Sequence, residues 1–140
     1  MKQQRGFTLI ELLVTVTIIA VLMGIGFVSY SNASKASRDS KRMADIEAVR
    51  QALALYRSEE GGYPIAINNG YVNMVVQLVS GGYLSNPYPV DPGATTPYHY
   101  SYSVGGVYCL CADLENDDKS NSNNVCNMAG SGGYYCATSQ

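Results

Sequence analysis

The sequence predicts an α+β fold, in which a long N-terminal helix precedes a small antiparallel sheet. An apolar run extends from Phe7 to about Tyr30, and a helical pattern without proline continues from it to Glu60. Beyond that residue, short alternating segments are separated by glycines and prolines. We therefore expect four parts: a leader at 1–6, a membrane-spanning helix at 7–30, an amphipathic helix at 31–60 and a globular α+β head at 61–140.

The apolar segment is long enough to cross a membrane. A span needs about 20 apolar residues, and the stretch from Leu9 to Tyr30 supplies them. A secretory signal peptide is the alternative, but its apolar core is only about 7–15 residues long. Lys2 and Arg5 precede the apolar run. The positive-inside rule therefore places the N-terminus in the cytoplasm and the head on the other side of the membrane.

One acidic side chain, Glu11, interrupts the apolar segment, and no other Asp, Glu, Lys or Arg lies between Phe7 and Ser34. A charged side chain near the centre of a membrane helix costs about 2.5–3.5 kcal/mol even on lenient scales. Thr8 and Glu11 have the spacing of a capping box, in which the carboxylate binds a backbone N–H of the first turn. Glu11 is therefore either a local cap or a group that pairs with a charge elsewhere.

The helix is expected to continue past the membrane segment as an amphipathic helix. Residues 33–42 are polar, and Gly61, Gly62 and Pro64 supply stop signals after Glu60. Between them, apolar residues recur at steps of three and four, at Met43, Ile46, Val49, Leu53 and Tyr56. This spacing predicts one apolar stripe that forms a wall of the core of the head.

The segment after the long helix combines a second, short helix with an irregular stretch. Residues 71–84 fit a short helix that Gly81 and Gly82 end. Three prolines within residues 87–92 exclude regular structure there.

Three strands are expected in the rest of the head. Residues 98–102 and 107–114 alternate between polar and apolar side chains, and Gly105 and Gly106 lie between them. This pattern predicts two antiparallel strands joined by a tight turn. Residues 132–137 are the candidate third strand.

Four cysteines lie in the head, at Cys109, Cys111, Cys126 and Cys136. An even number of cysteines in an exported domain favours disulfides. Zinc is the alternative, but the paired Cys-x-x-Cys spacing of structural zinc sites is absent. Cys109 and Cys111 point to the same face of a strand, so each needs its own partner. Three connectivities are open, and we expect the nested one, Cys111 with Cys126 and Cys109 with Cys136.

An acidic loop follows the second strand, with four carboxylates in residues 113–118. Oxygen-rich loops suit calcium, although the EF-hand spacing is absent. A solvated acidic loop is the alternative. The best candidate ligands are Asp113, Asp117 and Asp118.

The remaining composition gives little support for catalysis or nucleic-acid binding. His99 is the one histidine, and no Ser-His-Asp constellation or phosphate loop is present. The net charge is −2 and no basic stripe exists, so nucleic acid is not an expected partner. We expect a protein that is not an enzyme.

The N-terminus resembles a known family signal. Arg5-Gly6 followed by Phe-Thr-Leu-Ile-Glu-Leu-Leu-Val is similar to the class III signal of type IV pilins and type II secretion pseudopilins. The resemblance implies a pilin fold, cleavage by a prepilin peptidase between Gly6 and Phe7, and N-methylation of Phe7. It also implies that the helix at 7–30 forms the filament core after assembly. Glu11 would then pair with the Phe7 amine of a neighbouring subunit.

The head resembles major pseudopilins in the order of three short motifs, Gly62-Tyr63-Pro64, Pro89-Val90-Asp91-Pro92 and Tyr98-His99-Tyr100. The tryptophan and glycine typical after the Asp-Pro turn are replaced by residues 93–97. This departure weakens the assignment to type II secretion and leaves a type IV pilus subunit open. The resemblance also implies calcium in the acidic loop and a disulfide that fixes the C-terminal loop.

The expected function is that of a structural subunit of a type IV pilus-like filament or a type II secretion pseudopilus. The alternative is a membrane-anchored minor pilin that acts as an adhesion or binding module. The expected partners are further copies of the chain, a prepilin peptidase, an assembly ATPase, an inner-membrane platform protein, minor pilins and membrane lipid. The expected location is the bacterial inner membrane, and then a filament outside the cytoplasm.

Overall fold

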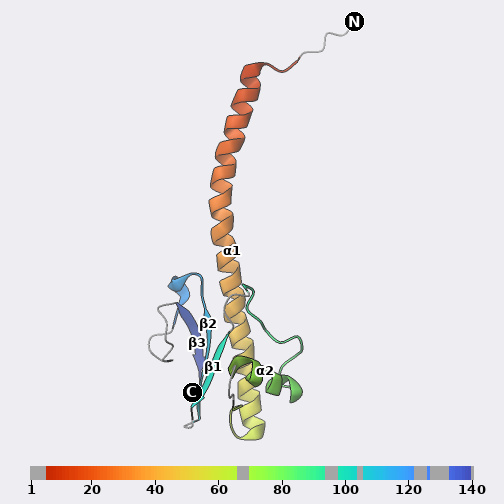
Figure 1. Ribbon diagram of the computed structural model, residues 1–140, viewed down its shortest axis with the longest axis vertical. Helices are drawn as coiled ribbons and strands as arrows, with labels where there is room; N and C mark the ends of the chain where they lie inside the picture. The colour runs from red at the N-terminus through yellow and green to blue at the C-terminus, as the bar shows by residue number, and fades with distance from the viewer. Residues whose placement is uncertain are drawn as a thin grey trace. The chain divides into compact units, whose positions relative to one another are not determined.

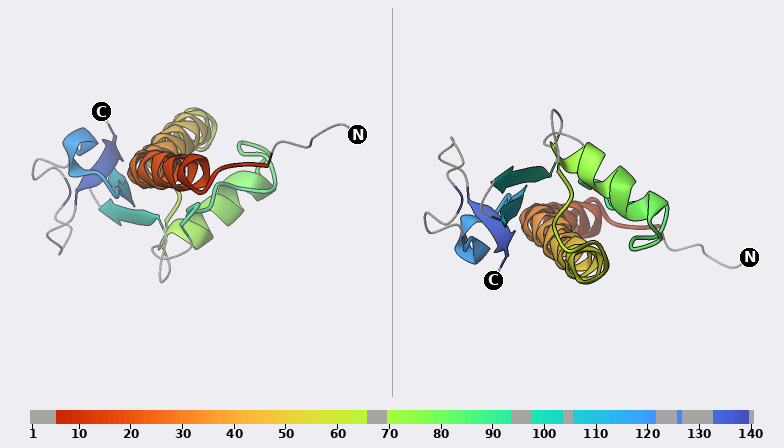
Figure 2. Two further views of the ribbon diagram at one scale, coloured as in Figure 1. Left: turned by 90° about the horizontal axis from the view of Figure 1, so that it is seen from above. Right: turned by 90° about the horizontal axis from the view of Figure 1, so that it is seen from below.

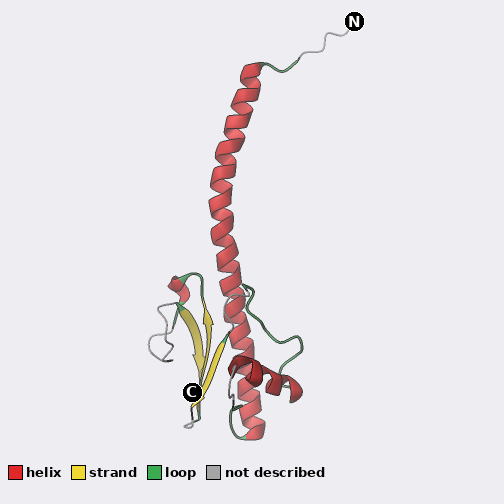
Figure 3. Cartoon of the chain, in the orientation of Figure 1, coloured by secondary structure: helices red, strands yellow, loops and turns green. Residues whose placement is uncertain are grey.

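The computed structural model describes residues 6–65, 70–93, 98–103, 106–121, 126 and 133–139. Figure 1 and Figure 3 show its elements. In chain order they are α1 (Leu9–Glu60), α2 (Gly70–Ser80), β1 (His99–Ser103), β2 (Val107–Asp113), the short 3₁₀ helix η1 (Asp117–Lys119) and β3 (Tyr134–Thr138). The predicted α+β class is confirmed. The chain divides into two compact units, Met1–Ser34 and Lys35–Gln140, which are described separately.

The first unit contains the apolar part of α1, and its side chains are exposed all round the helix. Ile10, Ile18 and Phe27 have exposed fractions of 68%, 54% and 78%. Among the described residues, α1 is the helix that is long and apolar enough to cross a membrane. A helix that is apolar on every side belongs either in lipid or inside a larger assembly.

The second unit holds a three-stranded antiparallel sheet in the order β1-β2-β3. In the register, Tyr100 lies opposite Leu110, and Leu110 lies opposite Ala137. Gly106, at the turn between β1 and β2, has a φ of +80°, a conformation that L side chains rarely adopt. This arrangement confirms the predicted hairpin and third strand.

The core of the second unit lies between α1, α2 and one face of the sheet. Ile46, Val49 and Leu53 of the predicted stripe are fully buried, whereas Met43 and Tyr56 are half-buried. Ile46, Val49 and Leu53 belong to one apolar cluster, which Tyr56 packs against. The cluster also contains residues of α2 and of the sheet, among them Met74, Val75, Leu78, Tyr100, Leu110 and Ala137. Seen along α1 in Figure 2, the sheet and α2 lie on different sides of the helix.

Candidate functional site

The first turn of α1 closes a capping box between Thr8 and Glu11. The backbone N–H and the hydroxyl of Thr8 both donate to Glu11 Oε2, at 2.9 and 2.8 Å. In return, the backbone N–H of Glu11 donates to Thr8 Oγ1 at 3.3 Å. The cap therefore forms within one chain, as the Thr-x-x-Glu spacing predicts.

Two features of this turn bear on processing and assembly. Gly6 and Phe7 precede the first residue of α1 and are exposed, so the peptide bond between them lies outside the helix. Both hydrogen bonds that Glu11 accepts from Thr8 end on Oε2, and Oε1 takes part in neither. Gly6 and Phe7 thus lie just before the helix, and Glu11 lies in its first turn.

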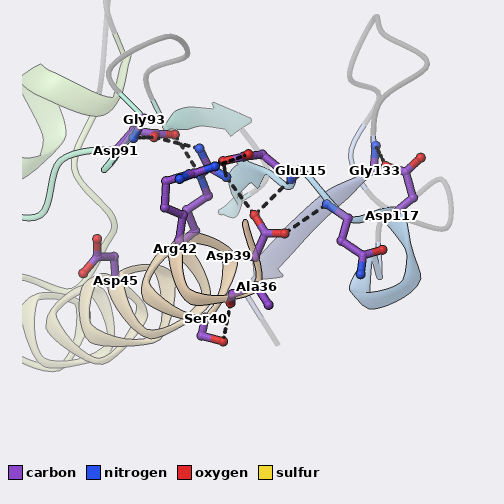
Figure 4. A network of polar contacts seen from close by, with 12 residues as sticks. Ala36, Asp39, Ser40, Arg42, Asp45, Asp91, Gly93, Glu115, Asp117 and Gly133 are labelled. Atoms are coloured by element: carbon purple, nitrogen blue, oxygen red, sulfur yellow. Dashed lines mark hydrogen bonds and ion pairs between the residues drawn. The ribbon is translucent and has the colours of Figure 1, made fainter. Parts of the chain in front are cut away.

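A buried ionic network surrounds Arg42 in the second unit (Figure 4). The Arg42 guanidinium donates to Asp91 through Nε and Nη2, at 3.1 and 3.0 Å. Its Nη1 donates to Asp39 Oδ1 at 2.7 Å and to Glu115 Oε1 at 3.0 Å. Arg42 and Asp39 have exposed fractions of only 2% and 0%. Such a buried arginine needs these partners to offset the cost of removing its charge from water.

The same network holds two loops against α1. Asp39 accepts the backbone N–H groups of Glu115 and Asn116, each at 2.9 Å. Asp91 Oδ1 accepts the backbone N–H of Gly93 at 2.6 Å. The Pro-Val-Asp-Pro turn and the segment after β2 are therefore both anchored to one short stretch of the helix.

Electrostatics favour the charged states of Arg42 and Glu115. Burial lowers the pKa of Arg42, but its hydrogen bonds with Asp91 and Asp39 outweigh this effect and raise the pKa overall. The hydrogen bond from Arg38, at 2.6 Å, is the main cause that lowers the pKa of Glu115 to about 2. Glu115 is therefore ionised at neutral pH and links two arginines.

This network was not predicted, because residues 33–42 stand out in the sequence only as a polar stretch. The spacing of two charged residues in this stretch nevertheless indicates the network. Asp39 lies three residues before Arg42, and Arg42 lies four residues before Ile46. Both charged residues therefore lie on the same face of the helix as the apolar stripe. A charged pair in phase with a core stripe indicates a buried ion pair.

The structure pairs the cysteines differently from the nested expectation, which is wrong. The bonds are Cys111–Cys136 and Cys109–Cys126, with Cα–Cα distances of 4.1 and 6.0 Å. The strand register gives the reason. Cys111 lies directly opposite Cys136, whereas Cys109 lies opposite Thr138 and has to bind the cysteine that the following loop supplies.

The acidic loop does not bring the three predicted calcium ligands together. Asp113 ends β2, and Asp117 Oδ1 accepts the backbone N–H of Gly133 at 3.0 Å. A Cβ on Gly133 would collide with Asp117, so glycine is required for this contact. Among the described residues, the carboxylate oxygens of Asp113, Asp117 and Asp118 do not all lie within 4.8 Å of one another. Calcium binding by these residues stays a prediction.

A groove borders α1 and the outer edge of the sheet and has a volume of about 530 Å³. Its walls carry charged and aromatic side chains, among them Glu47, Arg50, Arg57, Tyr63, Tyr108 and Tyr135. Arg50 pairs with Glu47 at 2.7 Å, and Arg57 donates to the hydroxyl of Tyr63 at 3.0 Å. The groove offers hydrogen-bonding groups and ring faces to a ligand.

Comparison with known proteins shows to which family the chain belongs. A family model for the prokaryotic N-terminal methylation motif matches residues 1–27. The type II secretion system core protein G of Pseudomonas aeruginosa is 30% identical over 108 residues, which cover 71% of this chain and 74% of that protein. The chain belongs to the pilin and pseudopilin family. The core protein G of Vibrio cholerae is 27% identical over 124 residues, or 81% of this chain and 84% of that protein.

Other relatives match about half of this chain. Prepilin peptidase-dependent protein D of Escherichia coli is 40% identical over 62 residues, or 44% of this chain. This chain spans only 42% of that relative and 50% of the Escherichia coli core protein G. No solved structure matches the chain. Family membership agrees with the expectation of a structural subunit that is not an enzyme.

Proposed function

We propose that this pilin-family subunit is cleaved between Gly6 and Phe7 by a prepilin peptidase, N-methylated at Phe7 and polymerised through its N-terminal helix. The product would be a type IV pilus-like filament or a type II secretion pseudopilus. The observation that carries the proposal is the apolar surface of α1, which is exposed all round the helix between Leu9 and Tyr30. Such a surface is stable only in lipid or against other apolar helices.

Glu11 would serve two stages of this process. In the single chain, its Oε2 caps the first turn of the helix through Thr8. Cleavage creates a positive amine on Phe7, and in the packed filament that amine would pair with Glu11 of a neighbouring subunit through Oε1. The pairing supplies the opposite charge that a buried carboxylate requires.

The proposal includes a single-pass position in the inner membrane before assembly. Lys2 and Arg5 would keep the N-terminus in the cytoplasm, with the head on the other side. Membrane lipid would cover the apolar helix until further copies of the chain replace it. An assembly ATPase, a platform protein and minor pilins would act on the chain as partners.

The test of processing is the intact mass and the N-terminal peptide of the protein from its native envelope. We expect a chain that starts at Phe7 and carries one added methyl group. A chain that retains Met1, or that is cut near Ala33, would contradict the proposal.

The test of assembly separates the charge of Glu11 from its cap. Glu11→Gln keeps an amide oxygen that can accept from Thr8 but removes the negative charge, whereas Thr8→Val removes the hydroxyl and keeps the charge. We expect Glu11→Gln to insert in the membrane and to form few or no filaments, and Thr8→Val to assemble. Normal filaments from Glu11→Gln would exclude the proposed charge pairing.

The groove beside α1 favours the alternative function, that of a minor pilin with a binding role. Its tyrosines and arginines are residue types common at binding surfaces. Quantitative mass spectrometry of isolated filaments distinguishes the two functions. A major subunit would be the most abundant protein of the fibre, whereas a binding module would be present at a small fraction of it.

A further inference from the structure

The two disulfides lie in one cluster on the face of the sheet that does not join the main core. Cys109 and Cys111 alternate with Leu110 on β2, and Cys136 lies opposite Cys111 on β3. Together with Cys126 they form a separate buried group, which Tyr134 packs against. The sheet itself therefore places three of the four cysteines, and only Cys126 depends on the following loop.

The sulfur atoms of this cluster are close enough to share one ion. The Sγ atoms of Cys109, Cys111 and Cys126 all lie within 4.8 Å of one another. The Sγ of Cys136 is bonded to that of Cys111, so the fourth sulfur atom lies beside this group. Tetrahedral zinc with Zn–S bonds of about 2.3 Å needs sulfur atoms about 3.8 Å apart. Bonded sulfur atoms of a disulfide lie about 2.05 Å apart, so opening each bond has to be followed by separation of its two sulfur atoms.

We propose that the chain binds one zinc ion at Cys109, Cys111, Cys126 and Cys136 while these residues are thiols. Zinc would displace the four thiol protons and form a tetrathiolate with a net charge of −2. Two disulfide oxidants would each accept two electrons from the thiolates and two protons from the solvent and become dithiols. This closes both disulfides of the chain and releases Zn²⁺. Zinc and the two disulfides are thus mutually exclusive, and the inference does not rest on filament assembly.

Contacts other than disulfides hold Asn121 and Gly133, the residues on both sides of the segment that carries Cys126, at the sheet. The backbone N–H of Leu114 donates to the carbonyl of Gly133 at 2.9 Å. Asn121 pairs its side-chain amide with the backbone of Cys136, at 3.0 and 2.6 Å, and its backbone N–H donates to Tyr134 at 3.0 Å. These bonds do not involve the sulfur atoms, so they would remain when the disulfides are opened.

The fold also explains why the cysteine spacing gave little support for zinc. Structural zinc sites usually take two ligands from one Cys-x-x-Cys turn. Here the ligands would come from two neighbouring strands and a loop. The strand register, and not a short spacing in the sequence, would therefore bring the ligands together. Burial of Cys111 and Cys126, which are 0% and 8% exposed, would protect the bound ion from competing water.

The test uses the full chain in detergent, reduced with a phosphine and then freed of it under argon. Each phosphine takes an oxygen atom from water as it converts one disulfide into two thiols. We expect Co²⁺ to bind at one equivalent per chain with a thiolate charge-transfer band, and Zn²⁺ to displace it. Both metals should slow reoxidation at least tenfold, and the oxidised chain should bind neither.

Single substitutions identify the ligands. We expect each Cys→Ser variant to weaken Zn²⁺ binding by at least tenfold. His99→Ala is the matched control, because His99 lies opposite Cys111 on the same sheet face and is outside the sulfur cluster. Absence of a one-to-one complex, equal binding by the oxidised chain, or loss of binding in His99→Ala alone would each overturn the proposal.

Discussion

The two halves of α1 share one secondary structure but differ in what covers them. In the first half, Ile18 is 54% exposed, and its apolar neighbours are exposed on every side. In the second half, Ile46 is 0% exposed, and the apolar residues are confined to one stripe. The second half packs this stripe against α2 and the sheet.

This difference separates folding from assembly. Burial of the stripe stabilises the head without help from another molecule, whereas the first half gains nothing comparable from its own chain. A substitution in the second half should therefore change the stability of the head. A substitution in the first half should change insertion or assembly and leave that stability unaltered.

The largest effect on the head is expected from Arg42→Ala. The substitution leaves the buried carboxylates of Asp39 and Asp91 without their main counter-charge. Removing one partner of a buried ion pair costs about 3–5 kcal/mol. The measurement is denaturant unfolding of the full chain in detergent, followed by the near-ultraviolet circular dichroism of tyrosine. This signal reports the head, because every tyrosine except Tyr30 lies beyond residue 34.

Arg50→Ala is the matched control for that experiment. Arg50 lies on the same helix and also pairs with a carboxylate, Glu47, but both side chains are exposed. Exposed pairs of this kind contribute only about 0.3–0.5 kcal/mol. Equal losses from Arg42→Ala and Arg50→Ala would show that the buried network is not what anchors the two loops.

The second prediction compares matched isoleucines in the two halves of α1. Ile46→Ala should lower the free energy of unfolding of the head by about 2–5 kcal/mol, because it leaves a cavity in a packed core. Ile18→Ala removes the same atoms from an exposed surface and should leave this free energy unchanged within about 0.5 kcal/mol. A similar loss for both variants would mean that the two units do not fold independently.

Sequence reasoning succeeded where a local pattern determines the structure. The step of three and four from Ile46 to Leu53 identified the core face, and Gly106 marked the hairpin. It failed where distant segments meet. Two partners of Arg42, Asp91 and Glu115, lie 49 and 73 residues away in the chain, and no periodic pattern encodes them.

The cysteine pairing illustrates the same limit. Alternation along β2 correctly put Cys109 and Cys111 on one face, but the partner of each depends on the register between β2 and β3. A shift of two residues in that register would exchange the two candidates for Cys136. Sequence therefore indicated which face carries the sulfur cluster, and only the sheet determined which atoms are bonded.

The third prediction concerns the start of the exposed half. Thr8→Ala removes the hydroxyl that caps the helix, and loss of such a cap costs about 1 kcal/mol of local helix stability. We expect faster amide hydrogen exchange in the first turn of α1 and unchanged unfolding of the head. Protection equal to that of the parent chain in detergent would show that the lipid-like environment, and not the cap, fixes this turn.

The smallest predicted effect is a pH dependence from Glu115. Its pKa is lowered from the usual 4.5 to about 2, chiefly by the hydrogen bond from Arg38. A carboxylate whose pKa is lower in the folded state stabilises that state fully above pH 4.5, and the contribution is lost as pH falls toward 2. The effect is modest because Glu115 is partly exposed to water, which screens the pair.

Glu115→Gln isolates this contribution, because every other titrating group is common to both chains. The glutamine can still accept hydrogen bonds from Arg38 and Arg42, and it keeps the backbone N–H that donates to Asp39. As the pH falls from 4.5 toward 2, the free energy of unfolding of the parent chain should therefore decrease more than that of Glu115→Gln. If the free energies of unfolding of the two chains changed equally with pH, the charge of Glu115 would not stabilise the network. The anchoring of the loops would then rest on Asp39 and Asp91 alone.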